Sequence, residues 1–417
     1  MARLALERAP AASLPQRFLL SAPVWGMLAG VLLIVDADAL LRTRWSPATL
    51  ALVHVFTLGV LGNLMFGSVL QFLPVAAGVR VCGEARGGAW LHGAFNLGTL
   101  ALVTGLHAQW PAALALAALV LPAAFGGLGV MTLPGLFVAV GQRLLRAGLG
   151  AAIGCAVLTA LAGGVLALGL GGWLALPLAR LAGVHASWGV LGWMLLLMAS
   201  VARVVMPMFQ GTGAMPASAQ ALWSAGVVLG LPVATWLAWS GVERWLAAVV
   251  ASHALAFAIA VLWLQWRAPR PGRSALRWSW RAGAWLLVLA ALALLQGLRD
   301  GVLAGVLGLA IALPLLVTGM AREIIAFIGW IALQRRCGRG LQLPGVQRLL
   351  PQRDKTGALL AQLPPAVLLT LAVLWPSPWL ARAAGLAVLL AWLVEGWVLD
   401  GVRRRANRFA RGLAARP

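Results

Sequence analysis

Apolar runs of more than 18 residues recur from one end of this 417-residue chain to the other. Inside a bilayer the backbone must satisfy its own hydrogen bonds, so uncharged runs of this length are typical of membrane-spanning helices. Only 10% of the residues are charged, whereas a soluble protein carries about 25%. The sequence therefore predicts an all-α polytopic membrane bundle that forms a single domain over residues 1–417.

Charged residues and Pro/Gly breaks divide the chain into twelve predicted spans. The tenth would be about 51 Å long at about 1.5 Å per residue, and we take it as one tilted or protruding helix. The twelve predicted spans cover residues 18–41, 48–75, 88–107, 111–140, 147–171, 178–209, 217–240, 243–266, 278–297, 301–334, 356–376 and 378–400.

Basic residues are distributed unevenly between the two sides of this predicted bundle. With the N-terminus inside, 24 Lys and Arg residues fall on the cytoplasmic side and 6 on the other. The positive-inside rule then predicts that both termini are cytoplasmic. We expect the protein to lie in a bacterial-type inner (plasma) membrane. The net charge of +22 is thus explained by topology and contact with anionic lipid of the bilayer. Nucleic-acid binding is not expected, because no basic domain lies outside the spans.

The tetrapeptide GVLG occurs three times, starting at residues 59, 189 and 305, in the second, sixth and tenth predicted spans. A second likeness follows in each span: SVLQFLP at 68–74, SVARVVMP at 200–207 and GMAREIIA at 319–326. Recurrence every four helices predicts a threefold internal repeat of four-helix groups. We expect the second, sixth and tenth helices to be innermost, and the repeats to cover residues 18–140, 147–266 and 278–400.

Histidines lie at similar depths in three separate spans. His54 and His185 each precede a GVLG motif, and His253 lies in the eighth span. All three are expected about 8–14 Å from the outer ends of their helices. An ionisable residue inside a span indicates a functional site, and imidazole is a ligand of haem iron and copper. We therefore expect these histidines to bind a metal; the alternative is a hydrogen bond that joins helices.

Three long polar side chains occupy matching places later in the GVLG spans. Gln71 lies in the second span, Arg203 in the sixth and Arg322 in the tenth. Together they are candidates for an anion or lipid site. The alternative is that the arginines extend to the inner headgroups.

The chain resembles a known group of membrane proteins in the stretches RFLLSAPVW (17–25), HVFTLGVLGNLMFGSVLQFLPVAAG (54–78) and HASWGVLGWMLLLMASVARVVMPMFQ (185–210). With twelve helices in three groups of four, it resembles subunit I of the haem–copper oxidases, and more closely the NnrS-type proteins. The likeness covers roughly the whole chain at the level of architecture. It implies a protein that binds haem, of the b type, and copper, with a respiratory electron-transfer partner and a place in respiration or nitric oxide metabolism. By position, His54 would be a haem ligand and His185 the counterpart of a copper ligand.

Several features depart from the oxidase pattern. Haem–copper oxidases carry a histidine pair on the seventh helix and an HxH motif on the tenth, and both helices lack histidine here. Oxygen-reducing members also use a tyrosine, and this chain has none. We therefore do not expect a working terminal oxidase, and His253 has no counterpart in the pattern. Two other functions remain open: a membrane transporter, since repeats and broken helices also occur there, and a non-catalytic assembly or interaction subunit.

Overall fold

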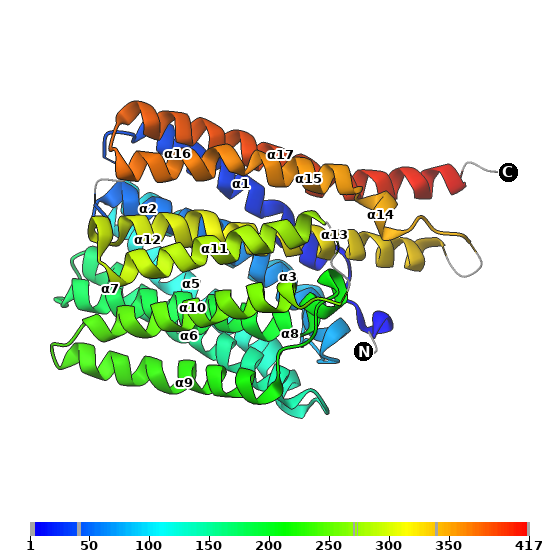
Figure 1. The fold of residues 1–417 in the computed structure, drawn as a ribbon, viewed down its shortest axis with the longest axis horizontal. Coiled ribbons are helices and arrows are strands. Elements are labelled where there is room, and N and C mark those ends of the chain that lie inside the picture. The colour runs from blue at the N-terminus through cyan, green and yellow to red at the C-terminus, as the bar shows by residue number, and fades with distance from the viewer. Residues whose placement is uncertain (1–4, 40–42, 270–271, 273, 338–340, 415–417) are drawn as a thin grey trace.

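The computed structural model describes residues 5–39, 43–269, 272, 274–337 and 341–414, and the regular structure in this part is helical. The long helices run side by side in one bundle (Figure 1), and they match the predicted spans one for one. In chain order they are α1 (Ser13–Val35); α2, η2 and α3 (Pro47–His54, Val55–Gly62, Asn63–Ala76); α4 (Glu84–His107); α5 (Pro111–Val138); α6 (Arg143–Leu170); α7, η3 and α8 (Leu178–Ser187, Trp188–Leu195, Leu196–Gln210); α9 (Ala217–Trp239); α10 (Arg244–Trp266); α11 (Ala275–Leu295); α12, η5 and α13 (Val302–Gly305, Val306–Ala312, Leu313–Cys337); α15 and α16 (Gln352–Ala361, Leu363–Leu374); and α17 (Pro378–Ala414). Short helices η1 (Leu6–Arg8), η4 (Leu298–Gly301) and α14 (Val346–Leu349) lie between them.

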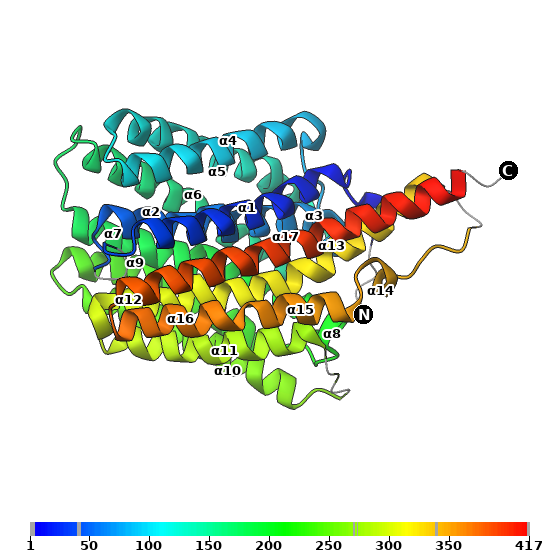
Figure 2. The same cartoon turned by 90° about the horizontal axis from the view of Figure 1, so that it is seen from above.

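Eleven helical runs in the described part of the chain are long and apolar enough to cross a membrane. The remaining long helix, α4, carries His92 and Asn96 and packs against α5. The prediction of an all-α polytopic bundle is confirmed, and the protein is a multi-pass membrane protein. The tenth span is one continuous run of 36 residues, Val302–Cys337. Both termini consequently lie at the same end of the bundle (Figures 1 and 2), which we call the terminal end; the other is the opposite end.

Most helices begin and end within four residues of their predicted limits, and α1 and α17 differ by more. α1 begins at Ser13 rather than 18, because the Arg17 side chain donates to the Ser13 carbonyl within the helix and does not interrupt it. α1 ends at Val35, so residues 36–39 of the predicted span form a turn instead of helix, and its last two residues, 40 and 41, lie outside the described residues. α17 continues to Ala414, well past 400. Its basic extension is held against the bundle because Arg405 pairs with Asp354 at 3.0 Å.

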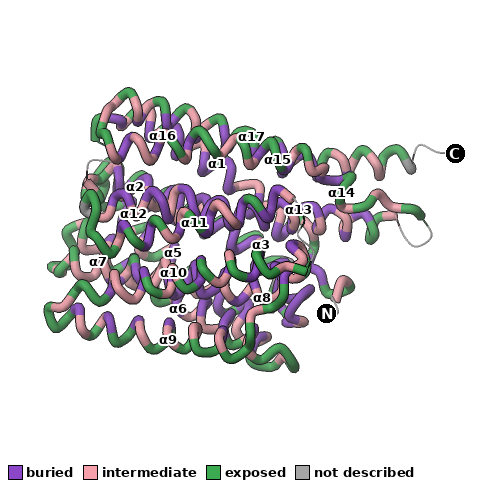
Figure 3. The backbone as a smooth tube through the Cα atoms, in the orientation of Figure 1, coloured by how far each residue is buried: buried purple, intermediate pink, exposed green. Residues whose placement is uncertain are grey.

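The three helical runs that carry GVLG are the most buried of the candidate spans. In their most apolar windows 72, 72 and 83% of residues are buried, against 22–50% in the other candidate spans. Figure 3 shows buried backbone concentrated in the middle of the bundle. Each run also changes from α- to π-helix at the motif, over η2, η3 and η5. π-Helices are rare and often mark functional sites. This shared geometry supports the threefold repeat, which stays a prediction.

Glycines of the motif permit close packing between helices. A Cβ atom added at Gly59 would lie 2.6 Å from the Trp25 ring, and one added at Gly192 would lie 2.9 Å from the Cys155 Cβ. Both separations are shorter than van der Waals contact, so only glycine fits at these positions. Small residues of this kind let membrane helices approach each other.

The cysteines allow a test of the topology. Cys82 is exposed in the α3–α4 loop and Cys337 is half-buried at the end of α13, both at the terminal end, while Cys155 is buried in α6. We expect a membrane-impermeant thiol reagent to label Cys82 and Cys337 from the same side. With cytoplasmic termini, labelling requires inverted vesicles or permeabilised cells, and Cys155 should react only after unfolding. Single-cysteine variants separate the signals. Labelling of Cys82 and Cys337 from opposite sides would contradict the single tenth span.

Candidate functional site

Two of the three predicted metal ligands lie side by side near the opposite end of the bundle. His54 is the last residue of α2 and His185 lies in α7, each close to the π-helical segment that follows. Their ring centroids are 6.2 Å apart and their ring planes differ by 28°. Two of the most buried runs thus bring two imidazoles together from sequence positions 131 residues apart.

Backbone carbonyls determine which nitrogen of each ring carries the hydrogen. His54 Nδ1 lies 2.7 Å from the carbonyl oxygen of Leu50, and His185 Nδ1 lies 3.0 Å from that of Thr159 on α6. A carbonyl oxygen can only accept, so Nδ1 is the donor in both rings. In the neutral ring Nε2 then keeps its lone pair. Histidines that bind metals are commonly held in this way, with the other ring nitrogen donating to a carbonyl.

His253 is not part of this pair. Its Nδ1 also donates to a carbonyl, that of Val249 at 2.8 Å, but its ring packs edge-on against Trp223 of α9 at 5.7 Å. Within the described residues, no ring contact or hydrogen bond joins it to His54 or His185. A hydrogen bond from Nδ1 to a backbone carbonyl therefore does not by itself identify a metal ligand. His54 and His185 differ from His253 because their rings lie next to each other.

The pair offers two nitrogen donors. Among the described residues no group of three or more His, Cys, Asp or Glu side chains could hold a metal ion. A structural zinc site needs four protein ligands, whereas haem iron needs only one or two because the macrocycle supplies the rest. Metal–imidazole bonds are about 2.0–2.1 Å long, so a centroid separation of 6.2 Å is compatible in distance with both rings binding one ion. The donor set fits axial ligation of haem or a two-coordinate metal.

The polar residues of α4 form a hydrogen-bond seam between helices. His92 Nε2 lies 2.9 Å from the Ser21 hydroxyl of α1. Asn96 and Asn63 exchange reciprocal amide hydrogen bonds at 3.1 and 3.2 Å, and Trp25 Nε1 donates to Asn96 at 2.7 Å. These groups join α1, α3 and α4, so this histidine has a structural partner.

The three deep polar residues lie in three different environments. Arg203 donates to Gln220 of α9 at 3.0 Å. Arg322 binds Glu395 of α17. Gln71 has no hydrogen-bond partner and lines a cavity at the terminal end. The structure gives the two arginines separate partners, and no hydrogen bond among the described residues joins any two of the three side chains.

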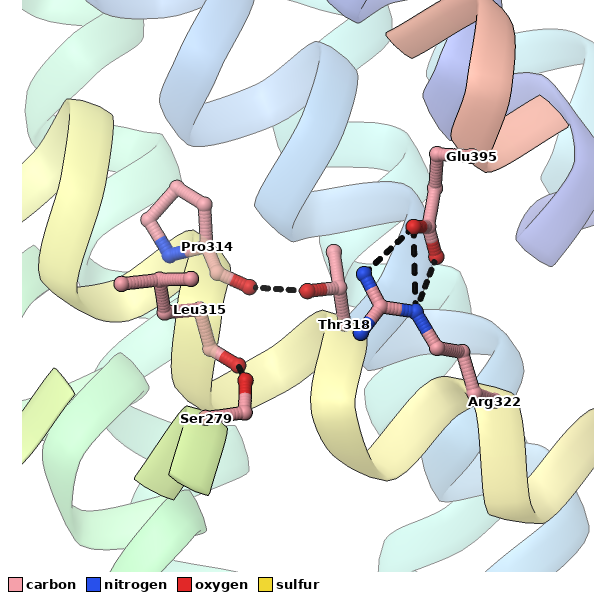
Figure 4. Close-up of polar contacts among 6 residues, drawn as sticks. All are labelled: Ser279, Pro314, Leu315, Thr318, Arg322 and Glu395. Atoms are coloured by element: carbon pink, nitrogen blue, oxygen red, sulfur yellow. Dashed lines mark hydrogen bonds and ion pairs between the residues drawn. The ribbon is translucent and has the colours of Figure 1, made fainter. Parts of the chain in front are cut away.

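The partner of Arg322 is the main feature that sequence reasoning missed. Arg322 and Glu395 are each 1% exposed, and the guanidinium makes contacts of 2.6–3.1 Å with the carboxylate (Figure 4). A signal existed, since Glu395 is an acidic residue inside the apolar last span, and such residues pair with one another. The neighbouring Glu323 points elsewhere and binds Lys355 of α15 at 2.7 Å.

No protein-family model and no curated protein matches this chain.

Proposed function

We propose that this is a membrane metalloprotein in which His54 and His185 bind one metal centre through Nε2. Haem iron, as b-type haem, is the first candidate and copper the second. The observation that carries the proposal is the facing pair of imidazoles, whose Nδ1 atoms are 2.7 and 3.0 Å from backbone carbonyls. Within the described residues, no hydrogen bond engages either Nε2.

A haem or copper centre held there would supply one-electron transfer or binding of a small gas such as nitric oxide. The protein's part would be to hold the imidazoles in one orientation, on two of its three most buried helical runs. Together with the sequence resemblance, this favours a role in respiratory electron transfer or nitric oxide metabolism, with a respiratory protein as partner. The absence of tyrosine argues against a terminal oxidase. We also propose, from the distribution of basic residues, that the protein lies in a bacterial-type inner membrane with cytoplasmic termini.

One observation favours a transporter as the second candidate. The fully buried pair of Arg322 and Glu395 lies inside the bundle, and intramembrane charges often mark ion pathways. The two charges neutralise each other, however, and the pair is held by three hydrogen bonds. This geometry suits a structural clamp better than a group that must release its partner during transport.

Metal and haem content of the purified wild-type protein tests the proposal. We expect a Soret absorption band, or failing haem, bound copper, at about one centre per chain, after expression in cells replete in haem and copper. Such a band follows from imidazole ligation of haem iron. Protein that contains neither haem nor a transition metal under these conditions would contradict the proposal and leave the transporter or assembly function.

Two glycines provide a matched pair of variants that do not replace any histidine. A Cβ at Gly163 would lie 2.9 Å from His185 Cε1, and a Cβ at Gly226 would lie 2.8 Å from His253 Nε2. Gly163→Ala should displace His185 and lower metal content per chain by about fivefold or more, because disturbing ligand orientation typically costs about 10–100-fold in affinity. Gly226→Ala should leave the content unchanged. Equal content in both variants would mean that His185 is not a ligand.

A further inference from the structure

We propose that a second site, at the terminal end of the bundle, binds a ligand that carries a phosphate group. A cavity of about 470 Å³ lies where the segment before α1 meets α3, α13 and α17. α13 packs against both α3 and α17, and Figures 1 and 2 show these helices side by side near that end. The cavity lies at the other end of the bundle from the histidine pair, so this proposal does not depend on the proposed metal centre.

An unpartnered amide lies in the wall of this cavity. Gln71 is only 4% exposed, yet neither its Nε2 nor its Oε1 has a hydrogen-bond partner. Buried side-chain amides nearly always have partners. Because Gln71 lines the cavity, a ligand there can accept a hydrogen bond from Nε2 and donate one to Oε1. A phosphate ester with a neighbouring hydroxyl offers both.

The charge of the lining favours an anion. Arg335, Arg336 and Arg403 contribute to it, and its described residues include no Asp or Glu. Arg403 is paired with Asp400 at 2.9 Å, outside the lining. In the described part of the chain, the other two meet neutral oxygens: Arg336 donates to Asn407 at 2.9 Å, and Arg335 donates to backbone carbonyls. Two positive charges are left without a carboxylate, and the planar guanidinium matches phosphate oxygens in pairs.

The lining of the cavity combines apolar and basic side chains. Ile328 and Ile331 of α13 and Ala406 of α17 form buried parts of its wall. Basic pockets between membrane helices near the cytoplasmic surface bind headgroups of anionic lipids. The phosphate can therefore come from an anionic phospholipid, whose chains would follow the apolar wall, or from a soluble phosphate compound.

Binding to the full-length protein in a neutral detergent tests the site and identifies the source. One arm titrates short-chain phosphatidylglycerol, with phosphatidylcholine as the comparison. The other titrates inorganic phosphate at constant ionic strength. We expect wild-type protein to bind phosphatidylglycerol or phosphate, which assigns the ligand to lipid or to a soluble compound, respectively. Preference for phosphatidylglycerol over phosphatidylcholine shows that charge is recognised. Failure to bind either anionic probe would overturn the proposal.

Variants then show whether the bound anion lies in this cavity. Arg335→Gln with Arg336→Gln should weaken binding at least about tenfold, since charge-assisted hydrogen bonds are about twice as strong as neutral ones. Arg408→Gln removes the same charge from an exposed position of α17 outside the lining and should change affinity less than about twofold. Gln71→Leu keeps all charges and should weaken binding about three- to tenfold. It shows whether the anion lies in this cavity if the double variant does not fold. Wild-type affinity in both cavity variants would overturn the proposal.

Discussion

Replacing Glu395 with leucine should lower the free energy of unfolding by about 3–5 kcal/mol, because it leaves the Arg322 guanidinium buried without a counter-charge. Both side chains are 1% exposed, so neither solvent nor salt can compensate. Arg322→Met should destabilise the protein by a similar amount, through the unpaired carboxylate. Reversible unfolding in mixed micelles, followed by the fluorescence of the 21 tryptophans, measures the effect.

The double variant Arg322→Met/Glu395→Leu tests whether each charge is needed only to neutralise the other. Replacing both members of a buried pair with apolar residues is often neutral, so most of the lost stability should return. The exposed pair of Arg180 and Glu243, 33% and 55% exposed, is the matched control. Breaking it should cost no more than about 1 kcal/mol. If the two single losses at the buried pair simply add in the double variant, the two charges do not stabilise each other.

Replacing either paired histidine should remove the metal centre. We expect His54→Ala and His185→Ala each to lower haem or metal content per chain at least about tenfold, because a lost ligand typically costs this much or more in affinity. His253→Ala is the internal control, since its ring faces Trp223. His107→Ala is the external control, since His107 pairs with Asp36 at 2.8 Å. Both controls should keep wild-type content.

Circular dichroism and elution volume of each variant exclude unfolding as the cause of a loss. Equal loss in all four histidine variants would indicate a general effect on folding. Full content in both His54→Ala and His185→Ala would show that the centre lies elsewhere.

Much of the fold could be predicted because one physical constraint dominates it. Backbone hydrogen bonds must close within each helix in lipid, so hydropathy locates the helices. Hydropathy does not locate the helix ends, because polar contacts determine where each helix begins and ends. Arg17 does not mark the start of α1, since it lies within the helix and its side chain donates to the Ser13 carbonyl. The arginine-rich end of α17 stays helical because Val402 and Ala406 are buried against the bundle.

The candidate site was predicted only in part. The depth of a residue in the membrane follows from counting residues along its helix. This count identified three histidines at similar depths as candidate ligands. Which of them face each other depends on the rotation of each helix about its axis, and π-helical turns next to His54 and His185 change that rotation. A sequence pattern analysed at 3.6 residues per turn therefore cannot predict which way these side chains point. The partner of Arg322 is 73 residues away in the chain, so only the fold reveals it.

X-ray absorption at the metal edge of the purified, metal-loaded protein tests most directly whether His54 and His185 share one centre. The account predicts scattering from two imidazole rings in the wild type, with metal–nitrogen distances of about 2.0–2.1 Å. It predicts one imidazole ring, or no bound metal, in His54→Ala and in His185→Ala. An imidazole contribution that is absent from the wild type, or that is unchanged when both histidines are replaced, would contradict it.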